Sequence, residues 1–542
     1  MLKKYAGNKF NILAGSDLFK EYREGEYLYI DKTRFVEHIF QVNDKVILLP
    51  RPRRSGKTLN MDMLATFLDI TEDNKSLFED LYISSTQYFK EINQHPILFL
   101  SFKNLTYNNI ENSIHDYIIN IIKAYDIPSS DSIKKYIEAG KHDSNTILLE
   151  ITRQLQNKYN KQVYLLIDEY DKPITDSTFT DSGSIVRYTL SGILGAVLKG
   201  NPYLKKAIIT GVTRISHESL LSGLNNLSVY PITEYSLFDT DFMLTEEELS
   251  EILDTKHIEY IRPWYNNFRV GDSLLFNMWS TMNYIKEFYL TNKVPRFKNF
   301  WTSTGNSTIL KKLMDSQKAY QIRKMLVNKT EVEIREEASI EYAYIENKGK
   351  CTESQFYTIA LQAGYFTHRR IDNTNRLAIS IANEELKSEW ISILGDSVYE
   401  ESFSNIKSIF QEINHIDYFS ERLESEISHV LSYHDIGRLG LESAYHILFL
   451  GLVYDVGNVS SNKESGLGRF DILLKTSQYN AILEFKKSDT EKALKMNAKK
   501  AIDQIREQKY YVSLDKDKPI YFIGISCYKN MCMAQTELFN YI

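Results

Sequence analysis

The chain contains little cysteine, no long apolar run and no strong excess of either charge. Its 542 residues include only Cys351, Cys527 and Cys532, and these show no paired spacing of the kind that binds zinc. We therefore expect a reducing, cytoplasmic location without disulfides. The longest apolar stretch, near 447–454, is too short to span a bilayer, so no membrane association is expected. The N-terminus lacks the apolar core of a signal peptide.

The charge balance excludes a uniformly basic nucleic-acid-binding protein but leaves room for a local basic patch. The net charge is −6, and 43% apolar with 25% charged residues is ordinary for a globular protein. We find no internal repeat and no low-complexity linker. The length predicts three or four domains.

The sequence RPRRSGKTLNMDML, residues 51–64, follows an apolar run at 45–50 and leads into a helical pattern. A strand, a tight loop, Gly-Lys-Thr and a helix are the layout of a phosphate-binding P-loop. In that layout Lys57 contacts the β- and γ-phosphates, and the Thr58 hydroxyl binds Mg²⁺. The pattern requires glycine where this chain has Arg51, so a basic surface turn is the alternative for this stretch alone. The predicted ATP-binding residues of the loop are Arg53, Arg54, Ser55, Gly56, Lys57 and Thr58.

A second apolar run, VYLLI at 163–167, ends in Asp168 and Glu169. A β-branched and aromatic run of this length predicts a buried parallel strand. An acid at the end of such a strand is where a P-loop ATPase places its second Mg²⁺ contact. We predict that Asp168 binds the metal through water and that Glu169 polarises the attacking water. The alternative is a strand that ends in exposed acids.

Two further segments are candidates for the same site. KKAIITGVTRIS, residues 205–216, predicts a strand. Thr210 and Thr213 are candidates for sensing the γ-phosphate, and Arg214 for stabilising its charge, although an arginine after a strand is as often a surface residue. Residues 27–40 combine a short strand with an amphipathic helix, which lies either beside the adenine or simply in the core.

The middle of the chain predicts a largely helical region. Residues 240–345 are mostly of helical pattern, and Thr245 with Glu248 forms a capping box at the start of one helix. The stretch 350–388 predicts a helix and then a hairpin, which fits a winged-helix module. The arginine pair at 369–370 would contact phosphate or simply be solvated.

Six stretches resemble, in the same order, the bacterial AAA-ATPase-like proteins that carry a C-terminal PD-(D/E)XK nuclease-like domain. They are RPRRSGKTLNMDML, IDEYDKP, GVTRISHESLLSGLNN, TEEELSEIL, WYNNFRVGDSLLFNMWS and YFTHRR followed by ISIANEELKSEW. The resemblance covers almost the whole chain. Because the P-loop of that family commonly has arginine in place of the first glycine, Arg51 becomes support for the P-loop.

A second candidate site lies at 461–489. Two apolar strands, DILLK and AILEFKK, are joined by a turn, and alternation places Glu484 and Lys486 on one face of the second strand. Asp471 begins the first strand, which gives the active-site pattern of PD-(D/E)XK phosphodiesterases. We expect Asp471 and Glu484 to hold one or two Mg²⁺ ions and Lys486 to orient water or neutralise developing charge. The alternatives are solvated strand residues, or a nuclease fold that no longer cuts.

Further groups could complete this site. Glu442, at the start of a helical pattern, is a candidate metal ligand, and Gln504 is a candidate outer member. Lysines recur after the site at helical spacing and would hold a nucleic-acid backbone, or form an ordinary solvated face. These lysines are Lys492, Lys495, Lys499 and the adjacent Lys500.

We therefore expect an α/β P-loop NTPase domain with a doubly wound parallel sheet at 1–240. A helical lid and winged-helix-like region follows at 241–398, and a restriction-endonuclease-like α/β domain at 399–542. The predicted function is ATP binding and hydrolysis with nucleotide-regulated, Mg²⁺-dependent (or Mn²⁺-dependent) cleavage of nucleic acid, with DNA favoured over RNA. The alternative is an ATP-dependent regulator or scaffold that binds DNA or protein without cutting. By analogy with such ATPases, a homo-oligomer is the default expectation.

Overall fold

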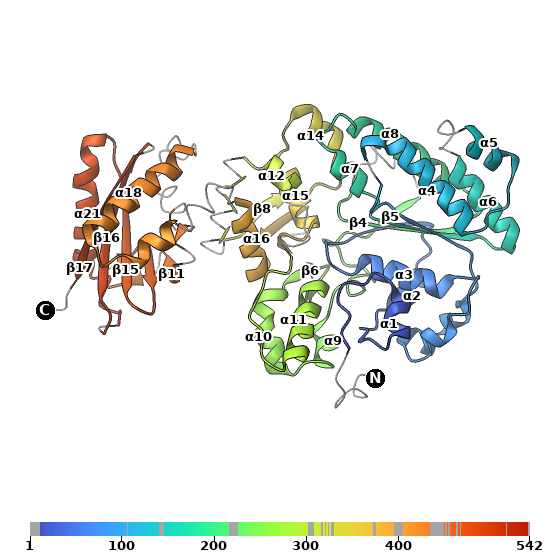
Figure 1. Cartoon of the computed structure of the whole chain (residues 1–542), viewed down its shortest axis with the longest axis horizontal. Coiled ribbons are helices and arrows are strands. Elements are labelled where there is room, and N and C mark those ends of the chain that lie inside the picture. Colours follow the sequence, from blue (N-terminus) through green and yellow to red (C-terminus); the bar gives the residue numbers. More distant parts are fainter. Residues whose placement is uncertain are drawn as a thin grey trace. The chain divides into compact units, whose positions relative to one another are not determined.

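The computed structural model places the chain in two compact units, which are considered separately (Figure 1). The first unit comprises residues 1–313 and 333–386, and the second comprises 314–332 and 387–542. The structure describes residues 11–105, 107–139, 146–215, 226–301, 308–315, 318–319, 321–322, 325–326, 330–371, 375–394, 405–433, 449, 452–453, 456–461, 464–466, 468–515, 517–529 and 531–539.

A five-stranded parallel sheet forms the centre of the first unit, in the order β2-β3-β4-β1-β5. Its strands are β1 (Val46–Pro50), β2 (Ile97–Ser101), β3 (Val163–Asp168), β4 (Leu204–Gly211) and β5 (Leu227–Val229). Every residue of β1 and β3 is buried, as expected for parallel strands covered on both faces. The predicted doubly wound α/β fold is confirmed.

Helices cover both faces of this sheet (Figure 1). One group packs around α3, and α3 with its neighbours shares a core with alternate residues of the strands. The other group packs around α8. The first group is α1 (Phe19–Glu24), α2 (Arg34–Gln41) and α3 (Lys57–Leu68); the second is α4 (Ile110–Ala124), α6 (Ile147–Tyr159) and α8 (Gly183–Leu198), with the shorter α5 (Asp131–Ala139) and α7 (Lys172–Ser177). Short 3₁₀ turns occur at Lys75–Leu77, Tyr82–Ser85, Gln87–Glu91 and Tyr107–Asn109.

The helical region of the first unit shares its core with the N-terminal segment. Its elements are α9 (Glu246–Ser250), α10 (Thr255–Tyr265), the hairpin β6 (Phe268–Val270) and β7 (Ser273–Leu275), α11 (Met278–Thr291) and α12 (Thr308–Leu313). The predicted capping box at the start of α9 is present. Tyr265, Phe276 and Tyr284 pack with Leu28 and Ile30, so aromatic residues of this region do fill a core.

The predicted helix and hairpin at 350–388 are also present. They are α15 (Glu353–Gln362), β9 (Thr367–Arg370) and β10 (Arg376–Ser380); β8 (Val332–Arg335) extends the sheet, and α14 (Tyr342–Lys348) and α16 (Glu384–Leu394) flank it. Most of this module belongs to the same compact unit as the parallel sheet. The domain boundaries at 240 and 398 stay predictions.

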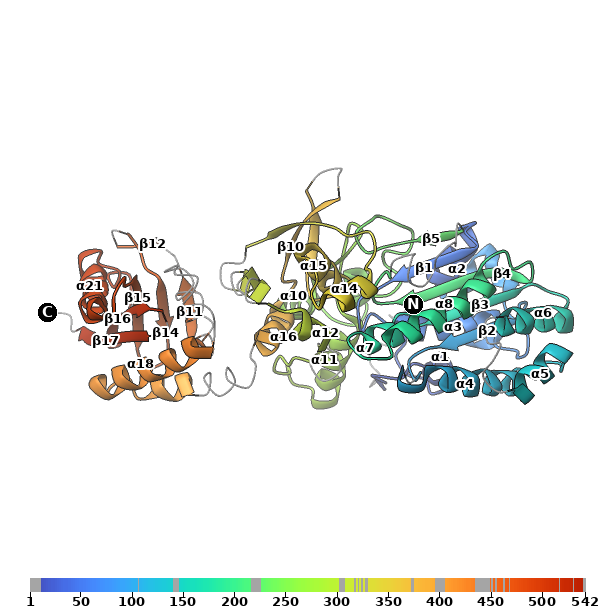
Figure 2. The same ribbon diagram turned by 90° about the horizontal axis from the view of Figure 1, so that it is seen from above.

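The second unit has a mixed five-stranded sheet, in the order β11-β14-β15-β16-β17, seen from above in Figure 2. Only β15 and β16 are parallel, with α21 between them in the sequence. Alternate residues of β15 face different cores: Leu483 and Phe485 pack in the core that includes α18, and Ile482 packs with α21. Its elements are α18 (Ile416–Tyr433), β11 (Asn458–Ser461), β12 (Glu464–Ser465), β13 (Gly468–Arg469), β14 (Ile472–Lys475), β15 (Asn480–Lys487), a 3₁₀ turn (Glu491–Ala493), α21 (Leu494–Glu507), β16 (Ile520–Tyr528) and β17 (Met531–Phe539). None of the helices that the structure describes is long and apolar enough to cross a bilayer.

Candidate functional sites

The loop between β1 and α3 turns through two residues of left-handed conformation. Gly56 is the N-cap of α3 with φ 88°, and Arg54 has φ 61°. A Cβ atom at Gly56 would lie 3.2 Å from the carbonyl oxygen of Phe242, so both conformation and close approach favour glycine here. Arg51 has a negative φ, and position 51 therefore needs no glycine.

Lys57 lies folded back over this loop. Its Nζ donates to the carbonyl oxygens of Arg51 at 3.2 Å and Pro52 at 2.9 Å. Burial lowers the pKa of Lys57, and the charges of Asp168 and Glu169 oppose that effect. The ammonium is thus held where the first turn of α3 presents backbone N–H groups, which is a position suited to phosphate oxygens.

Asp168, at the carboxyl end of β3, accepts hydrogen bonds from two other residues predicted for the ATP site, Thr58 and Thr210. Its carboxylate is fully buried; Oδ2 accepts a hydrogen bond from the Thr58 hydroxyl at 2.7 Å, and Oδ1 accepts one from the Thr210 hydroxyl at 2.7 Å. Hydroxyl and carboxylate oxygens are ligands that Mg²⁺ prefers. The donor set therefore fits the predicted metal.

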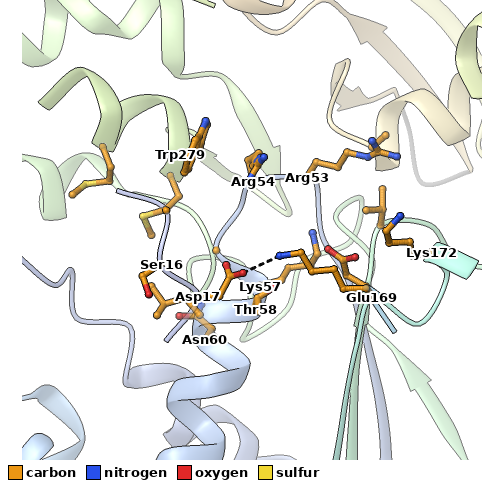
Figure 3. A pocket seen from close by; sticks show the side chains of 18 of the residues that line it. Ser16, Asp17, Arg53, Arg54, Lys57, Thr58, Asn60, Glu169, Lys172 and Trp279 are labelled. Atoms are coloured by element: carbon orange, nitrogen blue, oxygen red, sulfur yellow. Dashed lines mark hydrogen bonds and ion pairs between the residues drawn. The ribbon is translucent and has the colours of Figure 1, made fainter. Parts of the chain in front are cut away.

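Glu169 has the environment of a proton acceptor. Its backbone adopts φ 53°, and its side chain lines the cavity beside Lys57 and Thr58 (Figure 3). Burial raises the pKa of Glu169, the charge of Asp168 adds to that effect, and Lys57 and Lys103 oppose it. A carboxylate with a raised pKa binds a proton more readily near neutral pH than an ordinary glutamate does.

The cavity has a volume of about 390 Å³ and is bounded by distant parts of the first unit. Lys57, Thr58 and Glu169 line it in the region of the loop. Apolar side chains from the N-terminal segment and the helical region also line it, and they offer a surface for a flat ring. These are Leu13, Leu28, Ile30, Met278 and Met282. The short strand predicted near residue 28 is absent, because this segment runs as irregular backbone; its residues Leu28 and Ile30 line the cavity, whereas α2 contributes to the core.

The helical region and the winged-helix-like region both contact the loop between β1 and α3. The Arg54 guanidinium lies 4.6 Å from the centre of the Trp279 ring, and the backbone N–H of Trp279 donates to the Arg54 carbonyl at 3.4 Å. The N–H of Arg53 donates to the carbonyl of Ala363 at 3.5 Å. Figure 3 shows Arg53, Arg54 and Trp279 around the cavity, together with Asp17, which pairs with Lys103 at 3.0 Å. Both the helical and the winged-helix-like regions thus form walls of the cavity.

In the second unit, strand register brings the predicted acids together. Ile472 pairs with Leu483, which places Asp471 across from Glu484. The N–H of Phe485 donates to Asp471 Oδ2 at 2.8 Å, and the N–H of Asp471 donates to Glu484 Oε2 at 3.3 Å. Lys486 Nζ lies 3.9 Å from Glu484 Oε1, so the three predicted residues converge at one end of the hairpin.

Gln504 holds the buried carboxylate of Glu484 from α21. Its Nε2 donates to Glu484 Oε1 and lies 3.4 Å from the hydroxyl of Tyr510. Burial raises the pKa of Tyr510, and the charges of Glu484 and Asp471 add to that effect. Glu442 lies outside the described residues, among which no cluster of three His, Cys, Asp or Glu side chains could hold a metal.

Two family models match the parts of the chain that hold the two candidate sites. Residues 14–221 match the family model described as "Predicted AAA-ATPase", and residues 440–537 match that of the PD-(D/E)XK nuclease superfamily. The chain carries an AAA-ATPase-like domain and a PD-(D/E)XK nuclease superfamily domain. The predicted resemblance is confirmed for both parts.

Individual similar proteins add less. An "Uncharacterized protein in vnfD 5′ region" of Azotobacter chroococcum mcd 1 is 26% identical over 318 residues. The match covers 56% of this chain and 56% of that protein, so this chain spans about half the length of the curated relative it matches. A solved structure, "Structure of Drosophila ORC bound to DNA", matches with a TM-score of 0.24 and 10% identity, covering 71% of this chain and 94% of that chain. A TM-score this low supports no conclusion about fold or function.

Not every residue predicted for the ATPase domain faces the cavity. Ser55 is buried and does not line it. The backbone of Arg214 binds elsewhere: its N–H donates to Gln362 Oε1 at 3.1 Å and its carbonyl accepts from Ile340 at 2.8 Å. Thr210 reaches the site through Asp168, whereas Thr213 lines the cavity itself. The ATP contacts predicted for Ser55 and Arg214 remain predictions without a cavity contact.

Asp171 is a residue of the ATPase domain that sequence reasoning missed. It is buried, and its carboxylate accepts from the N–H groups of Val212 and Thr213 and from the Thr213 hydroxyl at 2.8 Å. The Tyr342 hydroxyl donates to that same Thr213 oxygen at 3.2 Å. The third acid of IDEYDKP was the only available signal, and it does not indicate this partner.

One prediction for the nuclease-superfamily domain was wrong, namely that Lys492, Lys495 and Lys499 share one helical face. Lys492 lies in the 3₁₀ turn before α21, so it does not continue the α-helical face of Lys495 and Lys499. The side chains of all four predicted lysines are exposed. A basic exposed surface beside the hairpin therefore exists, but it is built from a turn and a helix.

Proposed function

We propose that the protein is a metal-dependent nuclease whose cleavage of nucleic acid is controlled by a bound adenine nucleotide. The observation that carries this proposal is the convergence of Asp471, Glu484 and Lys486 at one end of a hairpin in a nuclease-superfamily domain. The ATPase-like domain of the same chain gathers Lys57 and Asp168 beside a cavity of suitable size.

In the ATPase domain, nucleotide phosphates would lie at the N-terminus of α3. Lys57 exchanges two loop carbonyls for phosphate oxygens, and the apolar wall contacts the base. Mg²⁺ neutralises phosphate charge when bound, and Thr58 with Asp168 would hold it. Glu169 takes the proton of the attacking water, for which its raised pKa suits it.

In the nuclease domain, Asp471 and Glu484 would hold Mg²⁺ or Mn²⁺. Glu484 is 2% exposed, and Lys486 Nζ lies 3.9 Å from its Oε1. Carboxylate oxygens are ligands that Mg²⁺ prefers, so Glu484 and Asp471 suit this role. Such an ion activates water and stabilises the leaving oxygen when bound. Lys486 stabilises negative charge that develops on the phosphate, and Gln504 keeps the Glu484 carboxylate in place.

The substrate we propose is DNA. Lys495, Lys499 and Lys500 present positive charge on α21, the helix that also carries Gln504. Contacts of this kind bind phosphates without reading bases. Because such contacts do not read the bases, the experiment below tests RNA beside DNA.

The proposal is tested by incubating purified protein with supercoiled DNA, linear DNA and RNA in Mg²⁺ or Mn²⁺. Glu484→Gln should abolish cutting, since loss of a metal ligand exceeds the roughly 10–100-fold effect of losing an outer-shell partner. Glu537→Gln is the matched control, because Glu537 lies on β17 of the same domain and pairs with Arg506 outside the site.

Equal cutting by the parent and Glu484→Gln would contradict the assigned active site. If no DNA or RNA is cut while ATP turnover persists, the nuclease proposal is wrong. The regulator or scaffold, which binds without cutting, then becomes the better description.

A further inference from the structure

Arg51 occupies the position of the first P-loop glycine, yet its side chain points away from the phosphate site. Arg51 is 1% exposed and does not line the cavity. Nη1 donates to the carbonyls of Pro50 at 2.9 Å and Tyr230 at 2.7 Å, and Nη2 donates to that of Phe238 at 3.2 Å. The charge also lies 5.3 Å from the centre of the Phe242 ring.

Two of the three carbonyls that bind Arg51, those of Tyr230 and Phe238, belong to residues 230–243, which we call the connecting segment. This segment leads from the parallel sheet into the helical region and packs against the P-loop at several points. Asn60 Nδ2 donates to the Asp241 carbonyl at 2.7 Å, and the Phe242 carbonyl lies closest to the missing Cβ of Gly56. The loop and the connecting segment are therefore packed backbone against backbone.

The connecting segment also contacts the other walls of the nucleotide cavity. Lys32, which lines the cavity, donates from Nζ to the Thr240 carbonyl at 2.8 Å. Arg370 of the winged-helix-like sheet donates to the Thr233 carbonyl at 2.8 Å. A residue that fixes the loop to this segment thus fixes it relative to the remaining walls of the cavity.

The backbone of Arg51 takes part in the site directly. Its N–H donates to the Gly211 carbonyl at 3.0 Å, which extends the pairing of β1 with β4 past Pro50. Its carbonyl is one of the two that hold Lys57. The side chain therefore anchors the same residue whose backbone sets the position of the phosphate-binding lysine.

Burial lowers the pKa of Arg51 to about 10, with Asp239 and Asp241 opposing that effect. The guanidinium accordingly remains charged at neutral pH. Removing it would leave three buried carbonyls without this donor, and an unsatisfied buried acceptor is costly.

We propose that Arg51 is a positioning residue that ties the start of the P-loop to the connecting segment and so holds the loop in its nucleotide-binding shape. This inference rests on the proposed nucleotide site. It leads to an unusual expectation: restoring the consensus glycine should impair nucleotide binding.

The test uses the full chain and measures the Kd of Mg·ADP by calorimetry at a temperature where circular dichroism shows each variant folded. Arg51→Gly and Arg51→Met should weaken binding at least about tenfold, because both lose the charged donors. Arg51→Lys should recover much of the loss, since it keeps the charge. Arg187→Met is the control: Arg187 is part-buried, pairs with Glu346 at 2.6 Å and does not line the cavity, so its Kd should stay within about twofold of the parent.

Arg51→Met separates the loss of the charged donors from the loss of side-chain volume. Methionine keeps much of the volume of the arginine stem, whereas glycine leaves a void. Normal affinity in Arg51→Met would overturn the inference and assign Arg51 to space filling. A parent protein that binds no Mg·ADP would instead overturn the proposed nucleotide site, and this inference with it.

Discussion

At the scale of residues, Glu169 offers the sharpest test of the ATPase chemistry. Glu169→Gln should reduce ATP turnover by about 100-fold or more while Mg·ATP still binds, because the amide cannot accept a proton. The exposed residue Glu247 supplies the control Glu247→Gln, which should leave both unchanged. Steady-state turnover and calorimetric binding check the two halves of this prediction.

The pH profile adds a signature that fold damage would not give. Only ionised Glu169 accepts a proton, and its pKa is raised in the fold, so turnover should fall with acidification at a higher pH than for an ordinary glutamate. The residual activity of Glu169→Gln should lack that limb. An unchanged acid limb in the variant would assign the titration to another group.

Residues contiguous in a motif were predictable, and residues that act across the fold were not. Lys57, Thr58 and Asp168 each belong to a motif that is recognisable in the sequence. The structure places the Thr58 hydroxyl in a hydrogen bond with Asp168. The bond from Tyr342 to Thr213 spans 129 residues, so no local pattern encodes it. Arg51 departs from the general P-loop pattern and is supported only by the family resemblance, and nothing in its neighbours indicates that its side chain turns inward.

At the scale of elements, the packing of α21 on β16 holds Gln504 beside the proposed nuclease site. Gly524 pairs in register with Glu484, and a Cβ there would lie 2.1 Å from the Ala498 carbonyl oxygen of α21. Gly524→Ala must push the helix outward and should destabilise the protein by about 1–3 kcal/mol. Because α21 carries Gln504, DNA cleavage should fall as well.

Urea denaturation followed by circular dichroism measures that change. The matched substitution is Gly195→Ala, in the interior of α8, where no atom lies within 4 Å of the added Cβ. It should stabilise by about 0.5–1 kcal/mol through helix propensity. If Gly524→Ala proved as stable as the parent, the close approach of α21 would not be a requirement of the fold.

Element types followed from periodicity, whereas their partners did not. The run VYLLI predicted β3, and the helix and hairpin at 350–388 are present. The contribution of α15 to the wall of the cavity depends on tertiary packing, which a local pattern does not encode. The same holds for the 3₁₀ turn that interrupts the helical spacing of the lysines at Lys492.

At the scale of the whole molecule, the two compact units hold the two candidate sites, one in each unit. Sequence order alone predicted an ATPase-like part followed by a nuclease-like part, and both family models match. Their coupling is the central claim of our account. It requires that the occupancy of one site change the rate at the other, which no single motif can encode.

The most direct measurement is the initial rate of DNA cleavage with and without ATP, in the parent protein and in Lys57→Ala. We predict that ATP changes the rate of the parent and leaves the rate of Lys57→Ala unchanged, since Lys57 is the predicted phosphate contact. Cleavage by the parent at one rate with and without ATP, while ATP is bound and hydrolysed, would contradict the coupling.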